Sequence, residues 1–194
     1  MGICCQAQAQ LPMPWMKKKK KKNEALRSSE HPVVQSIRAI PIRVLTVGKK
    51  RSKGIQLVVD EYKEKINYYC SMEDVLIRSN PKNTSNVKAQ IEAEDISVIK
   101  QLRPDDWVLV LDEHGADITS EQLASLIEDA AITGSSRLSF CIGGPYGHGS
   151  QVRSRANLTI RLSSMVLNHQ IALIVLLEQI YRAWTILKGQ KYHH

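Results

Sequence analysis

The feature that most constrains the fold is a regular alternation, from residue 41 onward, of short apolar segments with longer amphipathic ones. WVLVLDEHG (107–115) begins with five consecutive apolar residues, as is typical of a strand buried on both faces of a parallel sheet. GIQLVVDEYKEKI (54–66) instead places apolar side chains at i, i+3, i+4, i+7 and i+11, which predicts a helix. This alternation predicts an α/β fold on a parallel or mixed sheet with flanking helices.

The same two patterns extend over the rest of the chain as far as residue 189. Strands are predicted at 42–49, 74–79, 107–115, 137–144 and 158–167 (the last with its exit loop), and helices at 54–66, 87–102, 119–134, 150–156 and 168–189. Thr119 and Gln122 stand at capping-box spacing, and Gly134 marks the end of the same helix. The segment 80–86 is predicted to be a loop from its Asn, Pro and Ser content.

The last predicted helix carries two apolar stripes side by side. The first is Leu173, Leu177, Ile180, Trp184 and Leu187, and the second is Ile171, Ile174, Tyr181 and Ile186. One sheet face covers only one such stripe, so the second predicts a homodimer built on this helix. Glu178 and Arg182 stand at i, i+4 on the polar side, either as a surface ion pair or at the edge of a site.

Residues 1–39 differ in composition from the remainder. They hold eight Lys or Arg against two Glu, and so carry six of the eight net positive charges of the chain. The Lys17–Lys22 block would repel itself in a compact form, which predicts a disordered basic extension (1–39) before a single domain (40–194). Three interpretations remain open: a lipid-anchored terminus, although Gln6 replaces the expected Ser or Thr; a targeting segment for an organelle; or a solvated tail.

The cysteines and the apolar runs exclude several classes of protein. The four cysteines form no C-x-x-C pair and have no histidines at metal spacing, so neither a disulfide framework nor a metal site is expected. The longest apolar run, 171–177, is far shorter than the roughly 20 residues that span a bilayer, so stable membrane insertion is not expected.

The segment FCIGGPYGHGSQ (140–151) predicts where a ligand binds. Loops that follow parallel strands converge at the carboxyl ends of those strands, here 112–117, 143–150 and 163–169. The glycines lack the G-x-G-x-x-G spacing and the Gly-Lys-Ser/Thr of a phosphate loop, so neither a dinucleotide nor a nucleoside triphosphate is indicated. We expect a ligand held by main-chain groups against this glycine turn, which is defined as residues 143–149.

Several motifs occur together and in order: IRVLTVGK, DEY, RPDDWVLVLDEHG, IGGPYG, HQ, LLEQIYRAW and a terminal YHH. Over residues 40–194 the chain thereby resembles the RlmH (YbeA) family, SPOUT-class methyltransferases that act on N3 of a pseudouridine in bacterial-type large-subunit ribosomal RNA. The resemblance implies a trefoil-knotted fold, a homodimer, and S-adenosylmethionine as methyl donor without a metal.

The resemblance also implies which residues bind the cofactor. These are Leu111, Gly143, Leu162, Ser163, Ser164, Met165, Val166 and Leu167. Relatives commonly have proline and threonine where this chain has Ser164 and Val166. Loss of the threonine hydroxyl removes one hydrogen bond, a cost of about 1 kcal/mol.

Methyl transfer to a uracil-type N3 requires that the ring lose a proton, which calls for a base and for groups that stabilise charge. Tyr192, His193 and His194 are the candidates for the base, and Arg182 for charge on the uracil oxygens. His169 is expected to satisfy backbone groups beside its helix cap.

The expected function is therefore that of an S-adenosylmethionine-dependent ribosomal RNA methyltransferase that works on the large ribosomal subunit. The alternatives are a non-catalytic RNA- or ribosome-binding protein with the same fold and a peripheral membrane protein recruited by MGICC and the lysine block. The basic extension predicts a plastid or a mitochondrion, with the cytoplasm as the alternative.

Overall fold

The computed structural model describes residues 37–79 and 86–190. The chain divides into two units after Gln35, and all the elements below lie in the second unit, Ser36–His194. Residues 1–36 of the basic extension and 80–85 of the predicted loop fall outside the described residues, and both the extension and the loop stay predictions.

Five parallel strands form one sheet in the order β2-β1-β4-β3-β5. The strands are β1 (Ile42–Gly48), β2 (Met72–Arg78), β3 (Asp106–Asp117), β4 (Arg137–Ile142) and β5 (Leu158–Arg161). The predicted α/β fold is confirmed, and the choice between a parallel and a mixed sheet is settled as parallel. The trefoil knot stays a prediction.

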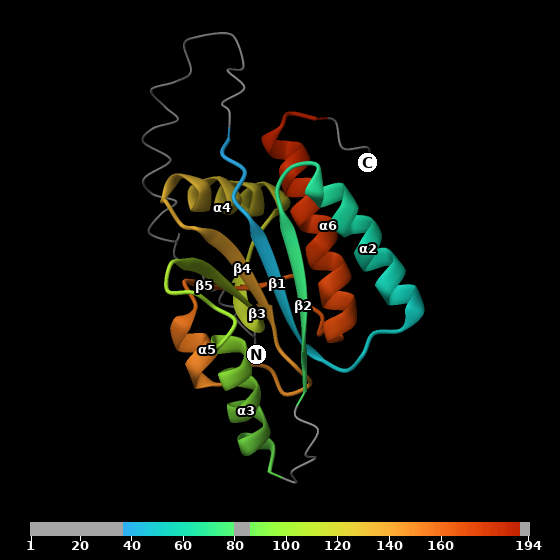
Figure 1. Cartoon of the computed structure of the whole chain (residues 1–194), viewed down its shortest axis with the longest axis vertical. Coiled ribbons are helices and arrows are strands. Elements are labelled where there is room, and N and C mark those ends of the chain that lie inside the picture. Colours follow the sequence, from blue (N-terminus) through green and yellow to red (C-terminus); the bar gives the residue numbers. More distant parts are fainter. Residues whose placement is uncertain (1–36, 80–85, 191–194) are drawn as a thin grey trace, which may run out of the picture. The chain divides into compact units, whose positions relative to one another are not determined.

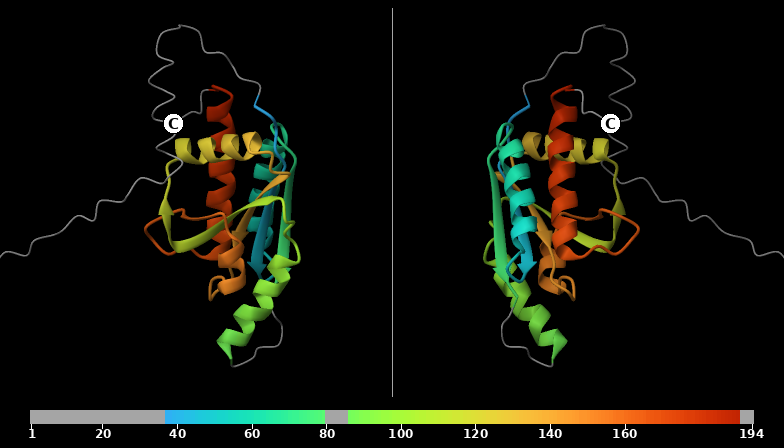
Figure 2. Two further views of the ribbon diagram at one scale, coloured as in Figure 1. Left: turned by 90° about the vertical axis from the view of Figure 1, so that its left-hand side faces the viewer. Right: turned by 90° about the vertical axis from the view of Figure 1, so that its right-hand side faces the viewer.

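Helices cover both faces of the sheet. They are α2 (Lys53–Asn67), α3 (Val87–Ile99), α4 (Ser120–Ile132), α5 (Ser150–Arg155) and α6 (His169–Leu187). Helices α2, α4 and α6 pack together on one face, and α3 and α5 pack together on the other (Figures 1 and 2). The predicted capping box at the start of α4 is present, with Thr119 and Gln122 bonding each other's backbone N–H.

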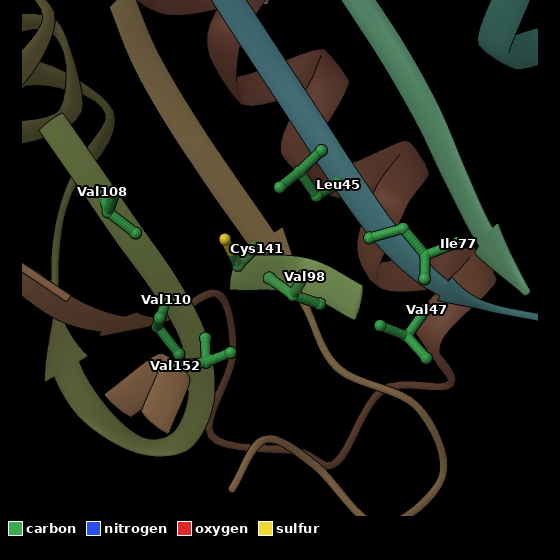
Figure 3. Packing of buried hydrophobic residues seen from close by; sticks show 8 residues of the cluster. All are labelled: Leu45, Val47, Ile77, Val98, Val108, Val110, Cys141 and Val152. Carbon is green, nitrogen blue, oxygen red and sulfur yellow. The ribbon is translucent and has the colours of Figure 1, made fainter. Parts of the chain in front are cut away.

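The apolar strands are buried on both sides, as their composition predicts. On the α3 and α5 face, Leu45, Val108 and Cys141 pack against Val98 of α3 and Val152 of α5 (Figure 3). Burial raises the pKa of the Cys141 thiol to about 12, so this thiol is protonated at neutral pH. This packed layer holds the short α5, and with it one wall of the site, against the sheet.

Helix α6 packs on the opposite face as the two-stripe pattern predicts. Leu173, Leu177, Ile180 and Trp184 of the first stripe are fully buried. In the second stripe Ile171 is 45% exposed and Ile186 is 37% exposed. By length and composition α6 is apolar enough to cross a membrane, yet it packs on α2, α4 and the sheet as a core helix does.

The end of β3 differs from the prediction. The sequence patterns overlapped here, with a strand expected over 107–115 and a loop over 112–117; in the structure Ala116 and Asp117 pair with Ile160 and Arg161 of β5 after a register shift, so the strand runs through the expected loop. A Cβ on Gly115 would lie 2.4 Å from the Ile160 carbonyl carbon, so only glycine allows this approach. The segment is therefore a bulged continuation of β3, and we call residues 112–115 the β3 bulge.

Candidate functional site

A cleft of about 590 Å³ opens at the carboxyl ends of β3, β4 and β5. Its walls are the β3 bulge, the glycine turn, the loop after β5 (162–168) and the first turn of α6. These are the three loops that the strand order was expected to bring together. The cleft is large enough for a small organic ligand, since such sites span about 300–1,000 Å³.

Seven of the eight residues predicted to bind the cofactor line this cleft. They are Leu111, Gly143, Leu162, Ser163, Met165, Val166 and Leu167. Ser164 is exposed and lies outside the lining. Met165 and Val166 are 73% and 80% exposed, so the loop after β5 presents apolar side chains at the cleft without covering them.

The glycines of this turn are required chiefly because the turn packs closely against itself and against its neighbours in the protein. A Cβ on Gly143 would lie 2.8 Å from the backbone carbon of Gly147, across a closed turn in which Gly144 and Gly147 form an isolated β-bridge. Gly147 has φ of +73°, a conformation that favours glycine. A Cβ on Gly149 would lie 2.6 Å from a carboxylate oxygen of Asp95. The glycines therefore allow the turn to close on itself and on α3. The sequence had predicted only that they let the backbone approach a ligand.

Asp95 of α3 anchors the base of the glycine turn. It is 2% exposed and accepts hydrogen bonds from the backbone N–H groups of Gly149 (2.8 Å), Gln151 (3.1 Å) and Val152 (3.3 Å). These are donors at the start of α5 that the helix itself leaves unpaired. Sequence reasoning missed this role, although Asp95 stands four residues after Ile91 and three before Val98, on the apolar side of α3.

Glu94 lies beside Asp95 and is also buried. Its Oε1 accepts bonds from the Ser79 hydroxyl (2.5 Å) and from Gln90 Nε2 (3.0 Å). Within residues 37–79 and 86–190 its Oε2 has no hydrogen-bond partner, and a Cβ on Gly144 would approach it to 3.0 Å. A larger residue at position 144 would therefore push directly against a buried carboxylate.

The β3 bulge adds a third buried carboxylate, that of Asp112, next to Leu111. The Asp112 side chain is 6% exposed, and its Oδ1 accepts from the backbone N–H of His114 at 3.0 Å. Its Oδ2 pairs with Arg153 at 2.5 Å. Burial alone would raise the pKa of Asp112, but the bonds from His114 and the charge of Arg153 outweigh it and lower the pKa. Asp112 is therefore ionised at neutral pH in the wall of the cleft.

Two further histidines lie near the cleft. His169 begins α6, and burial together with the charge of Arg51 lowers its pKa. Its Nε2 would lie 2.9 Å from a Cβ on Gly48 and has no hydrogen-bond partner in the described part of the chain, so the expected bond to backbone groups is not seen there. The cap itself is made by Asn168, whose side chain accepts from the Gln170 N–H at 2.9 Å. His148 is 5% exposed, and burial lowers its pKa.

Arg182 is not brought to this cleft. It pairs with Glu178 at 2.7 Å, as one of the two sequence interpretations expected. Arg182 lies 13 residues beyond His169, about 20 Å along the axis of α6, and it is not part of the cleft lining. The other predicted catalytic residues, Tyr192, His193 and His194, lie outside the described residues.

Comparison with known proteins adds the following findings. Residues 40–193 match a family model described as predicted SPOUT methyltransferase. An Arabidopsis thaliana protein, named provisionally as an RNA methyltransferase, is 59% identical over 194 residues and covers 100% of both chains. The ribosomal RNA large subunit methyltransferase H of Clostridium botulinum (strain Kyoto / Type A2) is 38% identical over 156 residues, 78% of this chain and 98% of that protein. A solved structure, a probable methyltransferase from Bordetella pertussis, covers 78% of this chain and 97% of its own at 15% identity and a TM-score of 0.48.

Proposed function

Because the chain belongs to the SPOUT methyltransferase family, we propose that it methylates large-subunit ribosomal RNA, with S-adenosylmethionine as donor and N3 of a pseudouridine as acceptor. The observation that carries the proposal is the match to nearly the full length of a large-subunit ribosomal RNA methyltransferase. The cleft lies in the matched region, at the strand ends where α/β proteins bind ligands.

The residues of the cleft suit S-adenosylmethionine, which when bound supplies an electrophilic methyl group. Leu111, Leu162 and Met165 offer apolar surface, and the glycine turn offers main-chain groups. The two arginines of the lining, Arg153 and Arg161, are each paired with a carboxylate from the end of β3. Their charge is therefore largely neutralised, as a ligand that carries a sulfonium and no phosphate requires.

The proposed chemistry also needs groups that handle the N3 proton. We assign this role to the terminal Tyr192, His193 and His194, and stabilisation of charge on the uracil oxygens to Arg182. Since Arg182 stands about 15 Å along α6 beyond Ala172, the last residue of this helix that lines the cleft of its own chain, it would act in the cleft of a partner subunit. The proposal therefore includes a homodimer with composite sites.

The homodimer is supported by the surface of α6. Ile171 and Ile186 stay exposed in the single chain, on the stripe that the sheet does not cover. Nearby, Met165 and Val166 of the loop after β5 are more exposed still. Apolar surface distributed in this way on one helix and an adjoining loop suits an isologous interface, in which the same patch serves both subunits.

A plastid or a mitochondrion is proposed as the location. The Clostridium relative matches only 156 residues, whereas the Arabidopsis relative matches all 194, so the basic extension has its counterpart in the plant protein. Plastids and mitochondria contain bacterial-type ribosomes, which are the proposed substrate. A full-length fluorescent fusion that stays wholly in the cytosol would favour the cytoplasmic alternative.

The proposed function is tested by labelled methyl transfer from S-adenosylmethionine to intact bacterial-type ribosomes. One ribosome preparation carries pseudouridine in the target helix, and a matched preparation carries uridine there. We expect label in the large-subunit RNA of the first preparation and little in the second. Cofactor binding without transfer to either preparation would instead support a non-catalytic ribosome-binding protein. Transfer to the small subunit alone would refute the proposed substrate.

A further inference from the structure

Arg153 of α5 contacts two of the three loops that form the cleft. Its guanidinium pairs with Asp112 of the β3 bulge at 2.5 Å, and its Nε donates to the backbone oxygen of His148 in the glycine turn at 2.9 Å. We propose that Arg153 is a positioning residue that holds these two loops together and thereby sets the affinity for S-adenosylmethionine. This inference rests on the proposed function and goes beyond it by assigning a residue that the motifs did not indicate.

The Asp112 carboxylate, which Arg153 contacts on the β3 bulge, is held in a fixed position. Asp112 follows Leu111 directly, and its side chain is 6% exposed. The backbone N–H and the Nδ1 of His114 lie 3.0 and 3.2 Å from Oδ1, so Oδ2 is left to face Arg153. A carboxylate held on both oxygens gives the arginine a fixed anchor rather than a mobile partner.

The hydrogen bond from Arg153 to the glycine turn is made at a residue that Asp95 of α3 does not bind. Asp95 binds the backbone at Gly149 and beyond, whereas Arg153 binds the carbonyl of His148. A Cβ on Gly147 would lie 3.8 Å from a terminal nitrogen of Arg153, so the guanidinium packs directly on the left-handed residue of the turn. Arg153 therefore restrains the segment that closes back on Gly143.

The chemistry of arginine suits this role. A guanidinium presents several N–H donors in a rigid plane and can serve a carboxylate and a carbonyl at the same time. The Arg153 side chain is 46% exposed and lines the cleft, while its described contacts are with protein groups of the cleft wall. Both contacts join segments of the cleft wall, so Arg153 acts on the shape of the cleft.

Arg155 provides a matched control in the same helix. It lies two residues further on and donates to the backbone oxygens of Arg103, Pro104 and Asp106, near the start of β3. It is not part of the cleft lining. Arg155→Gln therefore removes the same charge and more hydrogen bonds from α5 than Arg153→Gln does, without touching the β3 bulge or the glycine turn.

The experiment compares the full chain with its R153Q, R153K and R155Q variants. Calorimetry measures the dissociation constant for S-adenosylmethionine, and methyl transfer to ribosomes measures KM for the cofactor and kcat. We expect R153Q to raise the dissociation constant and KM about tenfold, in the range of coupled networks, with kcat within about twofold. The dissociation constant of R153K should lie between those of R153Q and wild type, because an ammonium keeps the charge but lacks the planar, forked donor geometry of a guanidinium. R155Q should lower thermal stability and leave the dissociation constant unchanged.

Amide hydrogen exchange of the protein without cofactor tests the same contact independently. Exchange in the segment 143–149 should accelerate in R153Q and stay at the wild-type rate in R155Q. Equal cofactor affinity in R153Q and R155Q, or a loss confined to kcat in R153Q, would overturn the proposed role. If the wild-type chain fails to bind S-adenosylmethionine, the proposed function fails. The exchange data still decide whether Arg153 holds the turn.

Discussion

Replacement of Asp95 by alanine should destabilise the domain by about 3 kcal/mol. The Asp95 carboxylate accepts three backbone hydrogen bonds at the start of α5, and it is 2% exposed. Each such bond contributes about 1 kcal/mol, and loss of a helix cap alone costs about 0.5–2 kcal/mol. Alanine would leave these donors without their acceptor beneath the glycine turn, so the turn should loosen as well.

Urea unfolding at fixed protein concentration measures this loss, with calorimetry of S-adenosylmethionine binding in parallel. Asp95→Asn should lose about half as much stability, because the amide keeps one acceptor oxygen where the carboxylate has two. Glu92→Ala, an exposed acid on the same helix, should change the unfolding free energy by less than about 0.5 kcal/mol. A loss below about 1 kcal/mol in Asp95→Ala, with unchanged cofactor affinity, would refute the view that this carboxylate holds the turn.

Four further predictions follow from other parts of the chain. Gly143→Ala should weaken cofactor binding at least tenfold and cost about 1–3 kcal/mol in urea unfolding, since its Cβ would lie 2.8 Å from backbone carbon of the turn; wild-type affinity would contradict this. Arg137→Ala should cost about 3–5 kcal/mol, because the buried carboxylate of Asp106, 2.6 Å away, loses its cationic partner and among the described residues keeps only its bonds from Ser139 and Arg103; activity per folded molecule should stay at the wild-type level. Burial lowers the pKa of His148 in the folded protein below its value in the unfolded chain. The stabilisation by neutral His148 is therefore present above about pH 6.5 and is lost as pH falls through the folded pKa. His148→Phe should flatten the drop in unfolding free energy between about pH 7 and pH 5. Deletion of 192–194 should lower single-turnover methyl transfer by roughly 10²–10⁴-fold with cofactor affinity retained; near-wild-type rates would remove the tail from the mechanism.

The fold was readable from local patterns because each element carries its own signals. The capping box of α4 and the apolar run of β3 are set by residues within one element, and both are found where they were predicted. The first stripe of α6 likewise predicted four buried side chains, whereas the second is divided between the exposed Ile171 and Ile186 and the half-buried Ile174 and Tyr181. Helix caps and periodic burial depend on spacing along the chain, so sequence alone suffices to find them.

The candidate site was predictable in its location and less so in its structure. The rule that loops meet at the carboxyl ends of parallel strands brought seven of the eight expected cofactor residues to one cleft. Ser164 was assigned from the family resemblance with the rest of its loop and is not part of the lining, because a loop need not present every side chain to the same side. Arg182 was assigned from the same motifs and lies far along α6 from the cleft of its own chain.

By itself, the sequence determined the order and type of the elements and the family to which the chain belongs. It left a parallel and a mixed sheet as alternatives, and the sheet is parallel. Only the tertiary structure shows why the turn at 143–149 is rich in glycine. The turn packs on Asp95 of α3, and Arg153 contacts both the turn and Asp112. It also decided that the β3 bulge continues the sheet, through pairing of Ala116 with Ile160. The partners in these contacts are up to 54 residues apart along the chain. No local pattern records them, because they arise only when folding buries a carboxylate and its backbone donors in the same place.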